Sequence, residues 1–203
     1  MKQRTLVVVS AGLSQPSSTR LLADQLSAAT VAAAAERDIE LRVRVIELRD
    51  LAHDIANHLL TGFPPGNLKE ALDAVAAADA LIAVTPIFTA SYSGLFKSFF
   101  DVVDKDALAD KPVLIAATAG TARHSLALEH ALRPMFAYLH AAVVSTSVFA
   151  ASDDWGAEST DGTIRSRVDR SAAELVQEME RRAPGHMTDP FALTSTFEEL
   201  LTS

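Results

Sequence analysis

The chain has 203 residues, of which 49% are hydrophobic and 22% are charged, with a formal net charge of −8 and no cysteine. This length and composition are typical of one globular domain with a substantial core, and the acidic balance argues against sequence-independent binding to nucleic acid, which needs a basic face. The lack of cysteine excludes disulfides, thiolate catalysis and cysteine-liganded metals.

The sequence carries no signal for a membrane or for export. No apolar run approaches the roughly 20 residues that a spanning helix needs. The first residues, MKQRTLVVVSAG, enter a strand-like run at once and lack the layout of a secretory signal. We therefore expect a cytoplasmic protein without a membrane partner.

The most distinctive stretch is SAGLSQPSST, residues 10–19, between a predicted strand over residues 5–9 and a predicted helix over 18–36. A polar loop in this place turns unpaired N–H groups and a helix dipole toward an anion. It lacks the GKS or GKT ending of a P-loop and the three-glycine dinucleotide fingerprint, so a terminal phosphate monoester fits better than a triphosphate. A plain surface loop whose hydroxyls cap the helix remains an equal alternative. The loop offers Gly12 for close backbone approach and hydroxyls at Ser10, Ser14, Ser17, Ser18 and Thr19.

The rest of the chain alternates between strands and helices. Residues 41–45 alternate between apolar and charged side chains, which predicts an edge strand with one wet face. Residues 49–60 are ambiguous, and Asn67 with Glu70 predicts an N-cap pair that opens a helix to about residue 78. Pro134 is expected to kink its helix. The remaining predicted strands cover residues 80–84, 112–117 and 142–149, the remaining helices cover 94–103, 123–140 and 164–182, and Ser195 with Glu198 predicts a short terminal turn.

This order predicts the fold. About five alternations of strand and helix indicate an α/β protein with a parallel sheet covered on both faces. An edge position for the second strand fits a flavodoxin-like three-layer sandwich, with a five-stranded sheet in the order 2-1-3-4-5. We expect the domain to cover residues 1–182, followed by a C-terminal extension over 183–203. Ligands bind such sheets beyond the carboxyl ends of the strands, so the loops after strands 1, 3 and 4 should converge at one mouth.

The loops expected at this mouth are poor in catalytic side chains. They contain no Asp or Glu, and His124 is the only histidine near them. Serines without a His–Asp arrangement do not make a triad, and no cluster of His, Asp or Glu has metal-ligand spacing, so we predict no catalytic residue and no metal. Phosphate donors, small residues and no acid or base suit a redox cofactor that carries the chemistry itself. FMN fits best, with its phosphate at the first loop and its ring against the other two.

Three stretches carry a resemblance to a known family: SSTRLLA at residues 17–23, TPIFTASYSGLFKSFFD at 85–101, and ATAGTARH at 117–124. They resemble the NADPH-dependent FMN reductases, over about residues 5–155. The similarity is greatest to the reductase components of two-component alkanesulfonate monooxygenase systems, in the branch that partners luciferase-like flavin monooxygenases. It implies an NAD(P)H:FMN oxidoreductase that transfers hydride directly to the flavin and delivers reduced FMN to such a partner.

The resemblance also implies where FMN lies. Its phosphate is expected at Ser10, Ser17 and Thr19, although Gly12 and Ser14 depart from the GS-x-R pattern of other members. Arg123 follows the third loop and either meets a phosphate of the nicotinamide nucleotide or is a solvated charge. Phe88 stands where many relatives carry tyrosine. The ring is expected along Pro86, Ile87, Phe88, Thr89 and Ser91 in the second loop, and along Thr118, Ala119, Gly120 and Thr121 in the third.

In the sulfonate-linked reductases, the helix that matches residues 125–140 lies at a tetramer interface and can carry a π-bulge. This implies a homotetramer, or at least a dimer. His130 stands where some members have tyrosine, and we interpret it as a packing or interface residue rather than a proton donor.

Two other functions share this fold. One is a flavodoxin-type electron carrier with permanently bound FMN, and the other is an NAD(P)H-dependent quinone or azo reductase. The sequence favours an exchangeable flavin, because Phe88 and Tyr92 are the only aromatic residues expected near the ring.

Overall fold

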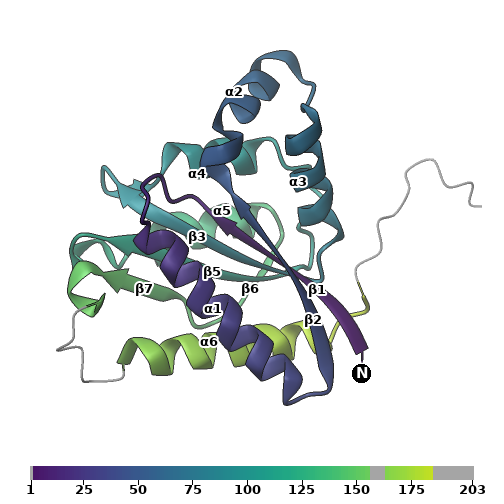
Figure 1. Ribbon diagram of the computed structural model, residues 1–203, viewed down its shortest axis with the longest axis vertical. Coiled ribbons are helices and arrows are strands. Elements are labelled where there is room, and N and C mark those ends of the chain that lie inside the picture. The colour runs from purple at the N-terminus through teal and green to yellow at the C-terminus, as the bar shows by residue number, and fades with distance from the viewer. Residues whose placement is uncertain (1, 156–162, 185–203) are drawn as a thin grey trace, which may run out of the picture.

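The computed structural model describes residues 2–155 and 163–184 and shows a twisted parallel sheet with helices packed on both faces (Figure 1). The strand order is β2-β1-β3-β5-β6. This is the flavodoxin-like α/β arrangement that the alternation of elements predicts. The strands are β1 (Lys2–Ser10), β2 (Ile39–Glu47), β3 (Ala80–Phe88), β4 (Ser91–Tyr92), β5 (Pro112–Ala119), β6 (Ala142–Val143) and β7 (Val148–Ala151).

The prediction of five strands is wrong in detail, because residues 2–155 and 163–184 already form a sheet of seven strands. β4 adds a short antiparallel pairing to the end of β3. The strand predicted over residues 142–149 is divided into β6 and β7, which both pair with β5. Between β6 and β7, backbone groups form hydrogen bonds with side chains. The N–H of Thr146 donates to the Glu174 carboxylate at 2.7 Å, and the Arg133 guanidinium donates to the carbonyl of Val144 at 3.1 Å. These bonds replace ladder bonds and interrupt the strand.

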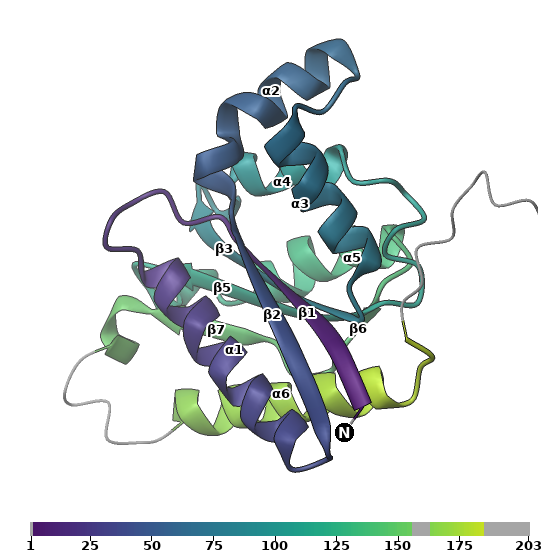
Figure 2. The ribbon, with the colours of Figure 1, turned by 45° about the vertical axis from the view of Figure 1, so that its right-hand side comes forward.

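Helices cover the two faces of the sheet (Figure 2). A separate hydrophobic core lies on each face. Because strand side chains alternate, Leu6 and Val8 of β1 belong to one core, and Val7 and Val9 belong to the other. The first face carries α1 (Ser18–Ala35) and α6 (Thr163–Glu180), and the second carries α2 (Ala52–Thr61), α3 (Gly66–Ala77), α4 (Gly94–Asp101) and α5 (Arg133–Tyr138). Within the described part of the chain, no helix combines the length and apolar character that a membrane crossing requires.

The helix predicted over residues 123–140 is broken into shorter pieces. A 3₁₀ turn covers Ala122–His124, a π-helix covers Leu128–Leu132, and α5 follows. The N–H of Arg133 donates to the carbonyl of Leu128, five residues earlier, as in a π-helix. Pro134 then has no N–H to donate, so the regular pattern cannot continue through it. The π-bulge that the family resemblance implies is therefore present at the expected place.

The structure also decides two local predictions near α2 and α3. The ambiguous segment before residue 60 forms a 3₁₀ turn, Leu48–Leu51, followed by α2. The predicted cap by Asn67 and Glu70 is wrong, because α3 begins at Gly66 with Pro65 at its N-cap and no side-chain capping bond. The predicted C-terminal extension is described only to residue 184, and the predicted turn at Ser195 and Glu198 lies outside the described residues.

A buried ion pair fixes the start of the sheet. Nη1 of Arg4 on β1 lies 2.8 Å from Oδ1 of Asp79, and both side chains are more than nine-tenths buried. The other oxygen of Asp79 accepts from the N–H and the hydroxyl of Thr5, at 2.6 and 2.9 Å. Nη2 of Arg4 donates to the carbonyl of Arg182 at 2.7 Å. The pair thus ties β1 to the start of β3 and to the residues after α6.

Candidate functional site

The three loops singled out in the sequence line one pocket of about 320 Å³ at the carboxyl ends of β1, β3 and β5. Ten predicted site residues line it. These are Ser14, Ser17, Ser18 and Thr19 from the first loop, Pro86, Ile87 and Phe88 from the second, and Thr118, Ala119 and Gly120 from the third.

The first loop ends at the N-terminus of α1, where the backbone offers hydrogen-bond donors. Ser17 is the N-cap residue, and its Oγ accepts from the N–H of Arg20 at 3.2 Å. The N–H groups of Ser18 and Thr19 lie in the first turn, where a helix supplies no acceptor of its own. With the positive end of the helix dipole, these groups suit an anion such as a phosphate.

A direct bond joins the first and third loops. The hydroxyls of Thr19 and Thr118 lie 2.8 Å apart, and both residues are buried. The Thr19 hydroxyl is therefore already used in holding the two loops together. Its N–H, which is one of the unpaired donors of the first turn, remains the stronger candidate for a phosphate contact.

Ser10 lies at the end of β1, between β2 and β3. It is fully buried, does not line the pocket, and its Oγ has no hydrogen-bond partner among the described residues. A buried hydroxyl without a partner is costly in a folded protein and indicates a bond to something else. Together with the unpaired N–H groups of α1, this donor set fits a phosphate group.

The second loop is a tight hairpin. β3 runs on to Phe88 and pairs with β4 across Thr89 and Ala90, which have φ of 49° and 67°. These left-handed conformations are typical of type I′ hairpin turns and are strained for a β-branched residue such as threonine. The hydroxyl of Thr85 supports the loop, since it accepts from the N–H of Ser93 at 3.1 Å and donates to the carbonyl of Pro86 at 2.9 Å. The hairpin presents Phe88, 47% exposed, at the pocket.

Comparisons with known proteins give the same assignment as this geometry. The family model described as "NADPH-dependent FMN reductase" matches residues 4–156. An FMN reductase (NADPH) of Pseudomonas aeruginosa is 37% identical over 82% of this chain and 90% of its own. The NADH-dependent FMN reductase SfnE of Pseudomonas putida is 36% identical over 88% of this chain and 90% of its own.

The chain belongs to the NADPH-dependent FMN reductase family.

Solved structures support the family and the fold. A crystal structure of an oxidoreductase from Corynebacterium diphtheriae superposes with a TM-score of 0.86 at 46% identity, over 90% of this chain and all of that one. The apo form of the NADH:FMN oxidoreductase EMOB gives a TM-score of 0.78 at 31% identity, over 92% of this chain and 96% of that one. The protein is thus a flavin reductase that uses FMN and NAD(P)H, as the resemblance of its three loops implies.

Six of the predicted site residues do not line the pocket of this flavin reductase. Ser10 and Gly12 are buried at the start of the first loop, Thr89 and Ser91 shape the hairpin, and Thr121 and Arg123 lie beyond the end of the third loop. Thr121 accepts from the N–H of Arg123 at 3.4 Å as the cap of the 3₁₀ turn. The Arg123 side chain is exposed.

Two pocket residues escaped the sequence analysis. Leu13, which is 52% exposed, is the one large apolar residue of the first loop. A single apolar side chain in a polar loop could have indicated a ligand contact. Ser152 lies directly after β7. It was missed because the last strand was predicted to end at residue 149, whereas β7 continues to Ala151 and brings a fourth strand end to the mouth.

No charged side chain lines the pocket among the described residues. The nearest cation along the chain, Arg20, forms ion pairs with Asp24 and Glu47. The hydrogen bond that Arg20 donates to Asp24, with Glu47 close by, raises the pKa of its guanidinium. A bound phosphate would therefore be held by neutral hydroxyls and backbone N–H groups.

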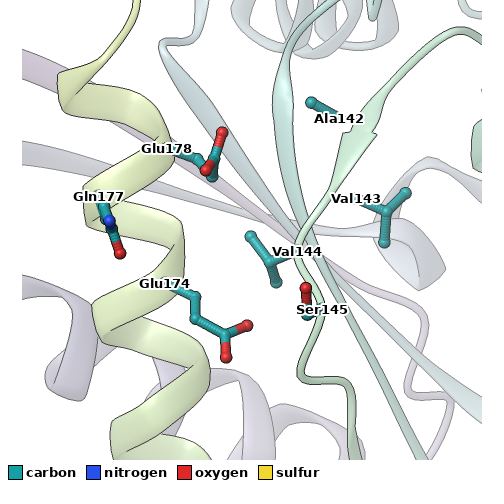
Figure 3. Close-up of a pocket in the computed structure, with 7 residues that line it drawn as sticks. All are labelled: Ala142, Val143, Val144, Ser145, Glu174, Gln177 and Glu178. Carbon is teal, nitrogen blue, oxygen red and sulfur yellow. The ribbon is translucent and has the colours of Figure 1, made fainter.

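A different pocket, of about 300 Å³, lies between α6 and the segment around β6 (Figure 3). Its two carboxylates already have partners: Glu174 accepts from the N–H and hydroxyl of Thr146, and Glu178 pairs with Arg182 at 2.7 Å. These acidic side chains would repel a phosphate. We therefore assign the flavin to the pocket formed by the three loops.

Replacing Gly12 by alanine is expected to weaken FMN binding about tenfold, which is about 1.4 kcal/mol, because the added methyl group would push Ser17 away from the phosphate. A Cβ at residue 12 would lie 2.1 Å from Oγ of Ser17, so the N-cap residue would have to move. Gly66→Ala is the matched control, since nothing lies within 4 Å of the added methyl group there. Fluorescence titration with FMN measures both, and equal affinities for the two variants would contradict the prediction.

Proposed function

We propose that the flavin reductase binds free FMN at the three-loop pocket, reduces it with NAD(P)H, and releases reduced FMN to a partner luciferase-like flavin monooxygenase in the cytoplasm. The resemblance of residues 17–23, 85–101 and 117–124 to reductases of two-component systems supports the partner. When bound, FMN supplies the hydride-accepting chemistry. The protein residues bind and orient the flavin, and none of the described side chains that line the pocket is an acid or a base.

The placement of FMN follows from the donors that each loop offers. The phosphate is assigned to the N-terminus of α1, where Ser17, Ser18 and Thr19 line the pocket. The buried, unpartnered hydroxyl of Ser10 lies at the end of the neighbouring strand β1. The ring lies against Phe88 and the small residues of the third loop. Thr89, Ser91 and Thr121 act by shaping the loops that hold the ring, and Arg123 is assigned to a phosphate of the nicotinamide nucleotide, as the resemblance suggests.

One observation carries the exchange of flavin: among the residues that the structure describes, no charged side chain lines the pocket. Phe88 and Leu13 remain about half exposed, and the third loop contributes only small residues. A dianionic phosphate bound without a cation, beside a ring with one exposed aromatic neighbour, gains less than a charged and enclosed site would provide.

We therefore expect the purified protein to be nearly colourless, with NAD(P)H oxidation that saturates at micromolar added FMN. The steady-state rate of NADH or NADPH oxidation, measured at increasing FMN concentration, tests this saturation. A parallel series with a quinone acceptor tests the alternative of a quinone or azo reductase. A yellow preparation that retains its flavin through dialysis, and whose oxidation rate ignores added FMN, would instead indicate a flavodoxin-type carrier.

We further propose that the protein is a homotetramer, or at least a dimer, with residues 125–140 at a subunit contact. This segment exposes two large apolar side chains, Leu126 at 64% and Tyr138 at 82%. The π-helix between them exposes His130, which agrees with a role at an interface rather than in the flavin pocket.

Replacing Leu126 and Tyr138 together by glutamate is expected to reduce the assembly to a smaller species, because two charges would be buried without partners. Light scattering at micromolar protein measures the mass. Phe63→Glu is the control, since Phe63 is 80% exposed but lies after α2, outside the segment. A monomeric unmodified protein would contradict the proposal.

A further inference from the structure

A pocket of about 280 Å³ adjoins the flavin pocket along the first loop. Ser14 and Ser17 line both pockets, so a ligand that extends past Ser17 would pass from one to the other. Small-molecule pockets span roughly 300–1,000 Å³, so the two adjoining pockets together have room for a larger ligand than either pocket alone. We call the adjoining one the Arg20–Arg49 pocket, after the two arginines that line it.

Carboxylates bond to Arg20 and lie close to Arg49. Nε of Arg20 lies 2.8 Å from Asp24, and its Nη1 pairs with Glu47 at the end of β2. Nε of Arg49 lies 3.6 Å from Glu47 and 3.4 Å from Asp50. That Nε is buried and has no hydrogen-bond partner among the described residues. Two guanidinium groups with restricted orientation therefore share the pocket with the carboxylates of Asp24 and Glu47.

The charges that line the Arg20–Arg49 pocket cancel, so a bare phosphate would gain little there. The side chains suit a ligand with a flat ring and hydroxyl groups instead. A guanidinium stacks on the face of an aromatic ring, as it does on nucleic-acid bases. Carboxylates such as Glu47 accept hydrogen bonds from ribose hydroxyls, as they do in dinucleotide sites. Pro16 and Leu21, the latter 47% exposed, add apolar surface.

We propose that the Arg20–Arg49 pocket binds the adenylate part of a dinucleotide whose other part occupies the flavin pocket. The proposal rests on the proposed function, because it takes the flavin pocket as the place that the rest of the ligand occupies. Two reactants carry an adenylate group: FAD, which continues directly from the flavin phosphate, and the nicotinamide dinucleotide.

A charge placed in the pocket tests the proposal. Leu21→Glu adds a carboxylate beside Asp24 and Glu47, where it would repel the diphosphate and the adenylate. Val31→Glu is the matched control, because Val31 lies on the same helix, is 40% exposed, and lines neither pocket. Fluorescence titrations of the unmodified protein and both variants with FMN and with FAD give the ratio of the two dissociation constants.

We expect the unmodified protein to bind FAD within about tenfold of FMN, and Leu21→Glu to shift the ratio against FAD by about fivefold or more. Val31→Glu should leave the ratio unchanged. A second series compares KM for NADPH with KM for reduced nicotinamide mononucleotide, which lacks the adenylate. If this second ratio shifts in Leu21→Glu and not in Val31→Glu, the result would support an adenylate site in the Arg20–Arg49 pocket and would assign it to the nicotinamide dinucleotide.

If neither ratio changes in Leu21→Glu while FMN still binds, the adenylate proposal is wrong and the proposed function stands. If the folded, unmodified protein binds no FMN, the proposed function itself fails. The two failures are therefore distinguishable in the same set of titrations.

Discussion

Replacing Ser17 and Thr19 together by alanine is expected to weaken FMN binding by about 1–3 kcal/mol, which is a loss of roughly 5- to 150-fold. The double variant removes a hydroxyl that lines the pocket at the N-cap of α1 and a hydroxyl that joins the first loop to the third. The Ser17 hydroxyl is the side-chain group assigned to the phosphate. A hydrogen bond to a charged phosphate is stronger than one between neutral groups, so its loss should dominate the change in affinity.

Riboflavin, which lacks the phosphate, separates this effect from general damage to the pocket. Titration of the double variant should show a smaller loss for riboflavin than for FMN. Ser27→Ala, on the same helix but away from the pocket, is the control for a lost hydroxyl. Ser17→Ala alone keeps the bond between Thr19 and Thr118 and so isolates the phosphate contact. Unchanged FMN affinity in a folded double variant would rule out the phosphate assignment.

Replacing Asp79 by alanine is expected to lower the free energy of unfolding by about 3–5 kcal/mol, because it leaves the charge of Arg4 buried without its partner. The change also removes the acceptor for the N–H and hydroxyl of Thr5, so three donors at the start of β1 lose their bonds. A loss of this size is a large part of the stability of a domain, so the variant should unfold at clearly lower denaturant concentration.

Asp73→Ala is the matched control for this change. It breaks the exposed i,i+4 pair between Lys69 and Asp73 on α3, whose side chains are 63% and 45% exposed. Exposed pairs of this kind contribute roughly 0.3–0.5 kcal/mol, so its denaturation curve should nearly overlay that of the unmodified protein. Equal midpoints for Asp79→Ala and Asp73→Ala would show that the buried pair does not stabilise the fold.

Much of the fold could be predicted from the sequence because its signals are local. The apolar run of residues 80–84 predicts a central strand, and β3 lies between β1 and β5. The alternating residues 41–45 predict an edge strand, and β2 lies at the edge. The predicted helices at residues 18–36 and 164–182 agree closely with α1 and α6.

The errors arose where side chains compete with regular backbone bonds. Thr146 and Arg133 interrupt the last predicted strand through bonds to Glu174 and to the carbonyl of Val144. The hairpin at Thr89 and Ala90 adopts left-handed conformations that neither residue type favours, so propensity gave no signal for β4. Both features depend on packing against elements elsewhere in the chain, which local patterns do not encode.

The sequence by itself determined the alternation of elements, the family and the three loops that form the flavin pocket, because each is carried by a contiguous run of residues. Only the tertiary structure decided which residues of those loops reach the pocket. Thr19 and Thr118 lie 99 positions apart and share a hydrogen bond, and Ser152 arrives from a strand whose end the sequence misplaced. The register and length of neighbouring strands determine which residues meet at the mouth of the sheet, and these depend on the packing of the whole domain.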